Sequence, residues 1–484
     1  MSGAPSQSRR IVEGPLALEL ARFGTPLAIG TGLQVTFNLV DAWILGKMPQ
    51  ADVGPAMGAL GICDQIAAIG TILSYGVSTA TAARLAILKG AGDMEGVKRT
   101  AWQSLIIVAV LSVIFGVLGI GLGGTVVRVV VGAKGSVAEV GESYLRVILG
   151  GGFSIFFLFQ LASIQRALGS AKTPVGLLVL GNIINVALAI VMVFGPEAPP
   201  IFAPFGVVAH ALGIPRMGMV GAAWATVIAR TLVLVPSIAI VARRFNVFPP
   251  LGDMLPDKRE IRTILRIAWP ASAQLVLRVS GMLLVTSVIA RAFTTATDQT
   301  ASTAIGLVFR LDTMALFVAM GWGSAAQTFV GQALGANRRD RARASGLVTA
   351  VYDTITNILI WYVVIHYGER ILRVFDADPA PLAIAMQYLG IVAPSYIGLG
   401  IGAVLANAMT GAGATRTTFV VDAAVLLGFE LPACILAVVV FKLPITGLFW
   451  CVALTSWTSA IAFLVVYLRG NWMGALARAD SSAK

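Results

Sequence analysis

The sequence predicts an all-α polytopic membrane protein with twelve transmembrane helices, arranged as two pseudo-symmetric six-helix bundles around a central cleft. Three observations carry this prediction. Hydrophobic residues make up 57% of the 484 residues and charged residues only 12%, against roughly 25% charged residues in an ordinary soluble domain. Apolar stretches near the length that crosses a bilayer, about 20 residues, recur along the chain. The second half of the chain also repeats the first. This composition excludes a water-soluble enzyme and a disordered chain.

The apolar stretches define the twelve predicted helices. Six of them contain no charged residue: 103–127, 147–165, 173–196, 313–337, 379–415 and 443–468. The other six contain a few charges: 15–46, 53–83, 219–241, 267–290, 347–367 and 417–441. The first apolar run extends from residue 11 to residue 45, whereas the apolar region of a signal peptide has about 7–15 residues. We therefore expect this first helix to remain in the mature protein.

The net charge of +12 is explained by topology. With the N-terminus placed inside and the helices alternating, 23 Lys and Arg residues lie on the cytoplasmic side and nine on the other side. This asymmetry follows the positive-inside rule. It predicts a multi-pass protein of the cell membrane with both termini in the cytoplasm. No nucleic-acid partner is needed to account for the basic balance.

The two halves of the chain resemble each other at a spacing of 244 residues. Residues 20–26 match 264–270, residues 144–145 match 388–389, and residues 169–173 match 413–417. Residues 221–224 match 447–450 at a spacing of 226, so the first half carries about 18 extra residues, which we place in the Pro-rich stretch 196–215. We predict an N-terminal bundle at 1–242, a cytoplasmic connector at 243–266 and a C-terminal bundle at 267–484. Parallel repeats of this kind suit transport by alternating access.

Short motifs recur in a fixed order along the chain. They are Pro26, Asn38-Leu-Val-Asp41, Gly46, Gly76-Val-Ser-Thr-Ala-Thr-Ala-Ala-Arg84, Gly90-Ala-Gly-Asp93, Arg166-Ala-Leu-Gly169, Lys172-Thr-Pro174, Asn182-Ile-Ile-Asn185, Gly221-Ala-Ala-Trp-Ala-Thr226, Gly331-Gln332 and Gly335-Ala336. In their order and spacing they resemble the multidrug and toxic compound extrusion (MATE) family over nearly the whole chain. The resemblance implies a secondary antiporter that exports organic, often cationic drugs or metabolites in exchange for H⁺ or Na⁺.

The resemblance also implies an ion-coupling site in the first half. Asp41 matches the family's ion-accepting carboxylate, and Asn185 and Thr226 match the residues that assist it. A second family Asp falls on Ala189 here, and a Glu used by another branch of the family falls on Arg278. A single titratable carboxylate favours H⁺ over Na⁺ as the coupling ion. We expect no other cofactor and no resident metal ion.

Other polar residues inside the predicted helices are candidates for a cavity or substrate site, because ionisable groups are costly in the bilayer. Asp64 either faces the same cavity as Asp41 or pairs with Gln34. Arg278 and Asp312 form either a buried ion pair or a binding site. The remaining candidates are Asn38, Asn182, Asp353, Asp422 and Glu430, and Pro26 is a candidate hinge because proline removes a helix hydrogen bond. Interhelical hydrogen bonding is the alternative explanation for the amides.

Two alternatives remain beside the exporter. A flippase for lipid-linked oligosaccharides of the same superfamily would hold a pyrophosphate with several cations inside the cavity, and only Arg230, Arg278 and Arg310 lie within predicted helices. A membrane-embedded enzyme would need a catalytic cluster, and the chain has two separate histidines, His210 and His366. The absence of a GxxxxGK[ST] loop argues against ATP as the energy source. We expect a small organic substrate, contact with membrane lipid, and a monomer.

Overall fold

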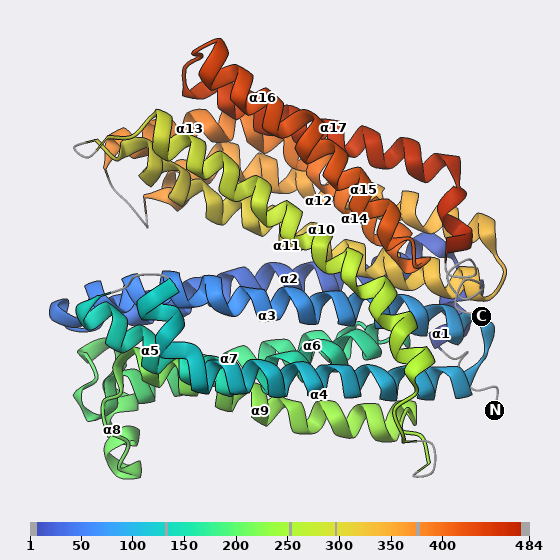
Figure 1. Cartoon of the computed structure of the whole chain (residues 1–484), viewed down its shortest axis with the longest axis horizontal. Coiled ribbons are helices and arrows are strands. Elements are labelled where there is room, and N and C mark those ends of the chain that lie inside the picture. Colours follow the sequence, from blue (N-terminus) through green and yellow to red (C-terminus); the bar gives the residue numbers. More distant parts are fainter. Residues whose placement is uncertain (1–6, 131–133, 251–253, 296–297, 374–377, 476–484) are drawn as a thin grey trace.

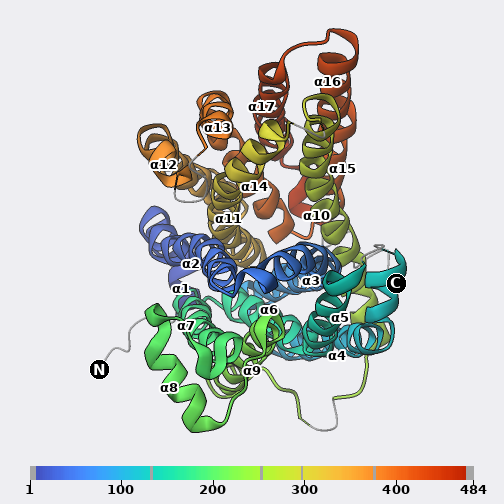
Figure 2. The same ribbon diagram turned by 90° about the vertical axis from the view of Figure 1, so that its left-hand side faces the viewer.

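The computed structural model describes residues 7–130, 134–250, 254–295, 298–373 and 378–475. These residues are almost entirely helical and form two bundles packed side by side (Figures 1 and 2). The N-terminal bundle contains α1 (Gln7–Glu13), α2 (Leu16–Gly46), α3 (Gln50–Ala91), α4 (Met94–Thr125), η1 (Val126–Val130), α5 (Gly135–Gly150), α6 (Gly152–Ala167), α7 (Lys172–Phe194), η2 (Gly195–Glu197), η3 (Pro200–Phe202), α8 (Ala203–Leu212) and α9 (Gly218–Phe245).

The C-terminal bundle contains α10 (Lys258–Ala292), α11 (Thr300–Gly335), α12 (Arg339–Leu372), α13 (Pro379–Val392), η5 (Ala393–Ser395), α14 (Tyr396–Gly411), α15 (Thr415–Val425), η6 (Leu426–Glu430), α16 (Leu431–Ile435), η7 (Leu436–Val440), α17 (Ile445–Arg469) and η8 (Asn471–Gly474). In the described part of the chain, 11 helices are long and apolar enough to cross a membrane, and a twelfth arises if one bent pair is a single span. This arrangement confirms the predicted fold class. The helix α10 begins at residue 258, so the segment between α9 and α10 is shorter than the predicted connector.

Two predicted helices are interrupted by a bend or a 3₁₀ turn, and the predicted helix 417–441 contains the π-helical turns η6 and η7. The α5–α6 pair bends by 42° between Gly150 and Gly152, where three successive glycines remove the side chains that favour a continuous helix. The α13–α14 span contains a short 3₁₀ turn at Ala393–Ser395, where Pro394 has no amide hydrogen to donate. Hydropathy alone does not reveal either break, because both segments remain apolar throughout.

The extra residues of the first half lie in the predicted stretch 196–215, and there they form separate short elements. The turns η2 and η3 and the short helix α8 fold as an appendage beyond the end of α7, at the end of the molecule away from both termini (Figure 1). The C-terminal bundle returns directly through residues 441–444. This difference explains the change of repeat spacing.

The bundles meet at the end of the molecule that holds both termini and diverge toward the other end (Figure 1). Hydrogen bonds join them at the closed end: Gln327 Nε2 donates to the Thr79 carbonyl at 2.9 Å, Gln332 Nε2 to the Ala167 carbonyl at 2.8 Å, and Arg341 Nη2 to the Gly14 carbonyl at 2.7 Å. A pocket of about 70 Å³ lies between the bundles, bounded by α3 on one side and by α10, α11 and α14 on the other. These hydrogen bonds join the bundles at the end that we call the closed end.

Candidate functional site

The N-terminal bundle brings Asp41 and Asn185 into direct contact. Asn185 Nδ2, on α7, donates to Asp41 Oδ1 at 2.9 Å and to Oδ2 at 3.1 Å, on the last turns of α2. Asn185 is buried and Asp41 is partly buried. The two residues, which the family resemblance assigns to one ion-coupling site, lie 144 positions apart in sequence and are in contact. A neutral amide that bridges both oxygens orients this carboxylate without neutralising it.

A cation lies near this pair. Arg230, on α9, is within electrostatic range of both Asp41 and Asp64, and Asp64, on α3, is within range of Asp41. The Tyr144 side chain, on α5, belongs to the same group. The helices α2, α3, α5, α7 and α9 thus contribute to one polar region that contains two acids and one guanidinium. The sequence indicated Arg230 only as an intramembrane cation one helical turn after Thr226.

The other first-half candidates are placed less directly. The Thr226 hydroxyl donates to the Ala222 carbonyl of its own helix at 2.9 Å and makes no hydrogen bond to Asp41. Asn182 Nδ2 and Asn185 Oδ1 are buried without a hydrogen-bond partner, so the described region offers one donor and one acceptor that remain unused. Gln34 is partly buried on α2. The side chain of Asn38 lies outside the described residues. The helix α2 runs through Pro26 without a break, and a hinge role for Pro26 stays a prediction.

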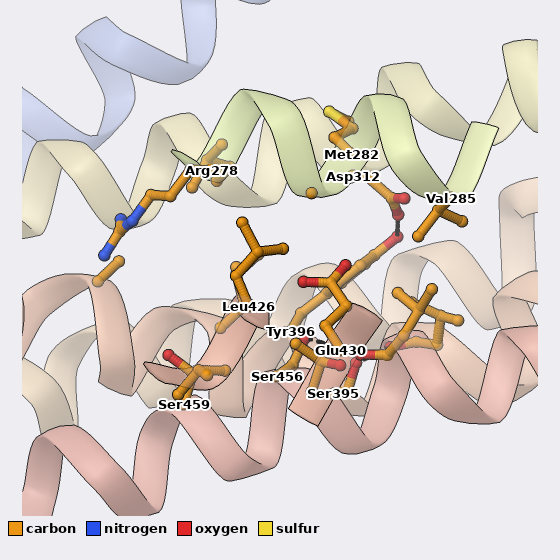
Figure 3. Close-up of a pocket in the computed structure, with 18 of the residues that line it drawn as sticks. Arg278, Met282, Val285, Asp312, Ser395, Tyr396, Leu426, Glu430, Ser456 and Ser459 are labelled. Atoms are coloured by element: carbon orange, nitrogen blue, oxygen red, sulfur yellow. Dashed lines mark hydrogen bonds between the residues drawn. The ribbon is translucent and has the colours of Figure 1, made fainter. Parts of the chain in front are cut away.

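The C-terminal bundle encloses a cavity of about 230 Å³ (Figure 3), larger than the 70 Å³ pocket between the bundles. It is lined from α10, α11, the α13–α14 break, the α15–η6 segment and α17, with Met282, Phe309 and Leu426 among its apolar contacts. Asp312, on α11, accepts hydrogen bonds from Tyr388 Oη at 2.5 Å and from Tyr396 Oη at 2.6 Å. The two tyrosines lie on either side of the α13–α14 break, so the break places both hydroxyls on one carboxylate.

Glu430 is the second acid of this cavity (Figure 3). It is partly buried and has no hydrogen-bond partner among the described residues. It ends the π-helical turn η6, directly before Leu431-Pro432, and such turns are often found at functional sites. Gly281 of α10 leaves it room, because a Cβ there would lie 3.1 Å from Glu430 Oε2. Besides Asp422, the cavity therefore contains one carboxylate held by tyrosines and one that is uncommitted.

Of the two alternatives for Arg278 and Asp312, the buried ion pair is wrong, whereas both residues line the C-terminal cavity. Arg278 Nε donates instead to Asp422 Oδ2 at 2.9 Å, and Gln274 Nε2 donates to the same oxygen at 2.6 Å. Arg278 and Asp422 are 144 residues apart, as are Asp41 and Asn185. The first membrane-spanning helix of each bundle, α2 or α10, thus contacts the fifth, α7 or α15, through a carboxylate, although at different depths. The Arg278 guanidinium also borders the pocket between the bundles, opposite Tyr75 of α3.

Asp353 was a cavity candidate, and the structure places it elsewhere. It is fully buried on α12, where Asn357 Nδ2 donates to its Oδ2 at 3.0 Å. It is not among the residues that line the C-terminal cavity. Gly400 of α14 packs against it, and a Cβ at that position would lie 1.9 Å from Asp353 Oδ2. Its position indicates a role in the packing of α12 on α14.

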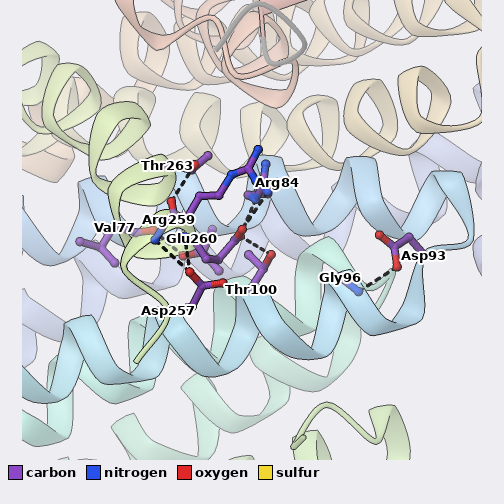
Figure 4. Close-up of polar contacts among 10 residues, drawn as sticks. Val77, Arg84, Asp93, Gly96, Thr100, Asp257, Arg259, Glu260 and Thr263 are labelled. Carbon is purple, nitrogen blue, oxygen red and sulfur yellow. Dashed lines mark hydrogen bonds and ion pairs between the residues drawn. The ribbon is translucent and has the colours of Figure 1, made fainter. Parts of the chain in front are cut away.

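A polar cluster that the sequence did not indicate joins the bundles at their closed end (Figure 4). Arg84 of α3 donates to both oxygens of Glu260 on α10, from Nε at 2.5 Å and from Nη2 at 2.8 Å. Thr100 Oγ1 of α4 donates to Glu260 Oε1 at 2.6 Å. The side chains of Arg84 and Glu260 are only 13% and 8% exposed. This bidentate pair, with Thr100, fixes the start of α10 to the N-terminal bundle.

The chain is similar to known membrane transporters over almost all of its length. The family model described as MatE matches residues 26–191 and 270–436, more than half of the chain and one segment in each bundle. The chain is 25% identical over 472 residues to "Probable multidrug resistance protein YpnP" of Bacillus subtilis, a match that covers 95% of this chain and 96% of that protein. It is 23% identical over 468 residues to "Probable multidrug resistance protein NorM" of Thermotoga maritima, covering 94% of this chain and 92% of that protein.

The same fold occurs in a solved structure described as "Outward-facing conformation of a multidrug resistance MATE family transporter of the MOP superfamily". The TM-score is 0.85 at 20% sequence identity, and the match covers 98% of this chain and 100% of that chain.

Proposed function

The chain belongs to the MatE family of multidrug efflux transporters, and on that premise we propose that it is a secondary active antiporter, which exports organic, often cationic drugs or metabolites in exchange for H⁺. The observation that carries the proposal is the contact between Asp41 and Asn185. A carboxylate in the bilayer is costly and is usually functional. This one is held by a neutral amide, so it can gain or lose a proton while its partner stays in place.

Proton coupling is favoured over sodium coupling by the ligands at the pair. The position on α7 at which the family resemblance would place a second Asp is occupied by Ala189, which is buried. The Thr226 hydroxyl donates a hydrogen bond to its own helix. A dehydrated Na⁺ ion needs several oxygen ligands at once, whereas a proton needs one carboxylate. Arg230 lies close enough to stabilise the charged form of Asp41 after the proton leaves.

The substrate site in this proposal is the C-terminal cavity. Asp312 and Glu430 supply negative charge, while Phe309, Tyr388 and Tyr396 supply aromatic surface. Carboxylates and aromatic faces together recognise organic cations. Arg278 does not oppose such a ligand, because Asp422 already pairs with it.

The orientation follows from the cations. Both termini and the basic ends of α9 and α10 lie at the closed end of the molecule (Figure 1). With that end in the cytoplasm, as the positive-inside rule requires, the divergence of the bundles faces outward. We propose that the protein works as a monomer in the cell membrane and requires no cofactor besides the coupling ion.

A flippase of the same superfamily is the second candidate, and the described cations do not favour it. A lipid-linked pyrophosphate needs uncommitted cations in the cavity. Arg278 pairs with Asp422, and Arg230 interacts electrostatically with Asp41 and Asp64. The described C-terminal cavity instead has an excess of carboxylates.

The test is efflux of a fluorescent organic cation from proteoliposomes that contain the purified full chain, under an imposed pH gradient or an imposed Na⁺ gradient. We expect the pH gradient alone to accelerate efflux. Acceleration by a Na⁺ gradient alone would overturn proton coupling. An efflux rate that neither gradient changes would overturn antiport. Protein-free liposomes under the same gradients correct for passive leak.

A further inference from the structure

A basic groove lies on the outer surface of the C-terminal bundle, near the closed end. It has a volume of about 590 Å³ and runs between the first turns of α10 and the start of α15, which pack side by side (Figure 2). Four cations line it: Lys258, Arg262 and Arg266 from α10, and Arg416 from α15. Its remaining lining residues are apolar. No carboxylate lines the groove in the part of the chain that the structure describes.

The spacing of these cations places them on one helix face. Lys258, Arg262 and Arg266 follow one another at intervals of four residues, so their side chains project in the same direction from successive turns. Arg416 is the second residue of α15 and faces them across the groove. Like charges at this spacing repel, and an anion between them would remove that cost.

Other cations at this end of the molecule are already committed. Arg84 is paired with Glu260, Arg341 donates to the Ile11 and Gly14 carbonyls, and Arg343 donates to the Leu468 carbonyl. Arg262 and Arg416, by contrast, are exposed and have no ion pair among the described residues. These two cations remain available to a ligand.

The apolar part of the groove leads toward the bilayer. Leu265 is 44% exposed and Trp269 is 52% exposed, and Trp269 packs edge-on against Phe419 of α15 with ring centroids 6.0 Å apart. Farther along the same helix, Val276 and Leu283 are 47% and 59% exposed. From Arg262 to Trp269 the helix rises about 10 Å, so the surface passes from cationic to apolar within roughly the depth of a headgroup layer. Tryptophan is also enriched at this boundary.

We propose that this groove binds an anionic phospholipid of the leaflet at the closed end. Its phosphate lies between Arg262 and Arg416, and an acyl chain follows Leu265 and Trp269. Basic pockets between transmembrane helices commonly hold anionic headgroups. A soluble phosphate would use the cations but leave the apolar wall exposed, so the two surfaces together fit a lipid.

The site shares a helical segment with the Arg84–Glu260 pair. Glu260 lies between Lys258 and Arg262 in sequence but points toward the N-terminal bundle. The bound lipid and the ion pair therefore hold opposite faces of the same two turns of α10.

The test uses the purified full chain in nonionic detergent, titrated with dibrominated phosphatidylglycerol or dibrominated phosphatidylcholine, because bromine quenches nearby tryptophan fluorescence. We expect a saturable quenching component with phosphatidylglycerol that is missing in Trp269→Phe. Each cation near an anionic headgroup increases the binding affinity about fivefold. The double variant Arg262→Gln/Arg416→Gln should therefore weaken this component by about 25-fold.

The matched control is Arg99→Gln/Arg339→Gln, which removes two exposed cations at the same end but outside the groove. It should bind like the wild type, and thermal unfolding of each variant verifies that it is folded. If a groove variant is unfolded, Arg262→Gln and Arg416→Gln are titrated singly. Equal affinities in groove and control variants, or equal quenching by phosphatidylcholine, would overturn the proposal. Displacement of the lipid by millimolar inorganic phosphate would assign the groove to a soluble anion, and a dimer lost only in the groove variant would assign it to a second copy of the chain.

Discussion

Asn185 bridges both carboxylate oxygens of Asp41, at 2.9 and 3.1 Å, across the contact between α7 and α2. This contact connects the first and fifth membrane helices of the N-terminal bundle. It makes the carboxylate a fixed point in the bundle, and its protonation state then bears on how the two helices pack.

Replacing Asp41 by Asn should reduce gradient-driven efflux to roughly a tenth of the wild-type rate or less, because an amide cannot carry a proton across the membrane. The measurement is efflux in everted vesicles, with insertion verified by the amount of protein in the membrane. Thr226→Val is the matched control, because the Thr226 hydroxyl bonds only to its own helix, and it should retain most of the activity. Normal efflux in Asp41→Asn would contradict the coupling assignment.

Glu430→Gln should weaken the binding of an organic cation by about tenfold, or about 1.4 kcal/mol, because it removes an uncommitted carboxylate from the cavity. Asp312→Asn should have a smaller effect, since the tyrosine hydroxyls already offset part of that charge. The measurement is the Kd of a fluorescent cation for purified protein. A neutral ligand of similar shape is the control and should bind both variants like the wild type, whereas equal losses for both ligands would indicate damage to the cavity rather than loss of charge.

Arg84→Gln should lower the stability of the closed end, because it leaves the buried Glu260 carboxylate with only Thr100 as a side-chain partner. Breaking such a pair costs about 3–5 kcal/mol when one partner is removed. The expected result is a lower midpoint of thermal unfolding and faster maleimide labelling in a Thr79→Cys background, where the bundles meet. Exposed Arg99→Gln is the control.

The double variant Arg84→Gln/Glu260→Gln separates the pair from its surroundings. If the two side chains stabilise each other, the double variant should be less destabilised than the sum of the single variants. Additive effects would mean that the pair contributes no coupling between α3 and α10.

Gly400→Ala should destabilise the C-terminal bundle by about 1–3 kcal/mol, the usual cost of overpacking. The added Cβ would lie 1.9 Å from Asp353 Oδ2 and 2.5 Å from Asn357 Nδ2. The measurement is thermal unfolding of the purified protein. Gly390→Ala, in the same predicted span, has nothing within 4 Å of its new Cβ, and an equal loss of stability there would argue against a specific clash at Gly400.

The helices, the duplication and the inserted segment could be predicted from the sequence, because each of these depends on hydropathy or on spacing along the chain. The sequence also indicated that Asp41 and Asn185 belong to one site, since both lie in motifs whose order and spacing resemble the MATE family. The depth of a residue in the bilayer follows from its distance to the helix ends. The direction of its side chain does not.

For that reason the sequence could not decide whether Arg278 pairs with Asp312, and the structure pairs it with Asp422. Asp312 and Asp422 are both acids on neighbouring spans, and only the rotation of α11 and α15 about their own axes decides between them. The same holds for Thr226, whose hydroxyl turns to its own backbone, and for Tyr388 and Tyr396, which a helix break brings onto one carboxylate. The pair of Arg84 and Glu260 spans 176 residues, and nothing local in either segment indicates the other.

The pairing of Arg278 with Asp422 leaves the C-terminal cavity with no uncompensated positive charge from Arg278. These two charges cancel, so an empty C-terminal cavity carries a formal charge of about −2 whenever Asp312 and Glu430 are both ionised. An elementary charge that crosses the full membrane potential changes its free energy by about 2.3 kcal/mol per 100 mV. A cavity loaded with a divalent cation would reorient almost without regard to voltage, whereas the empty cavity would not. The electric field would then act chiefly on the return of the substrate-free, proton-loaded protein, and the turnover rate should depend on voltage even where substrate binding does not.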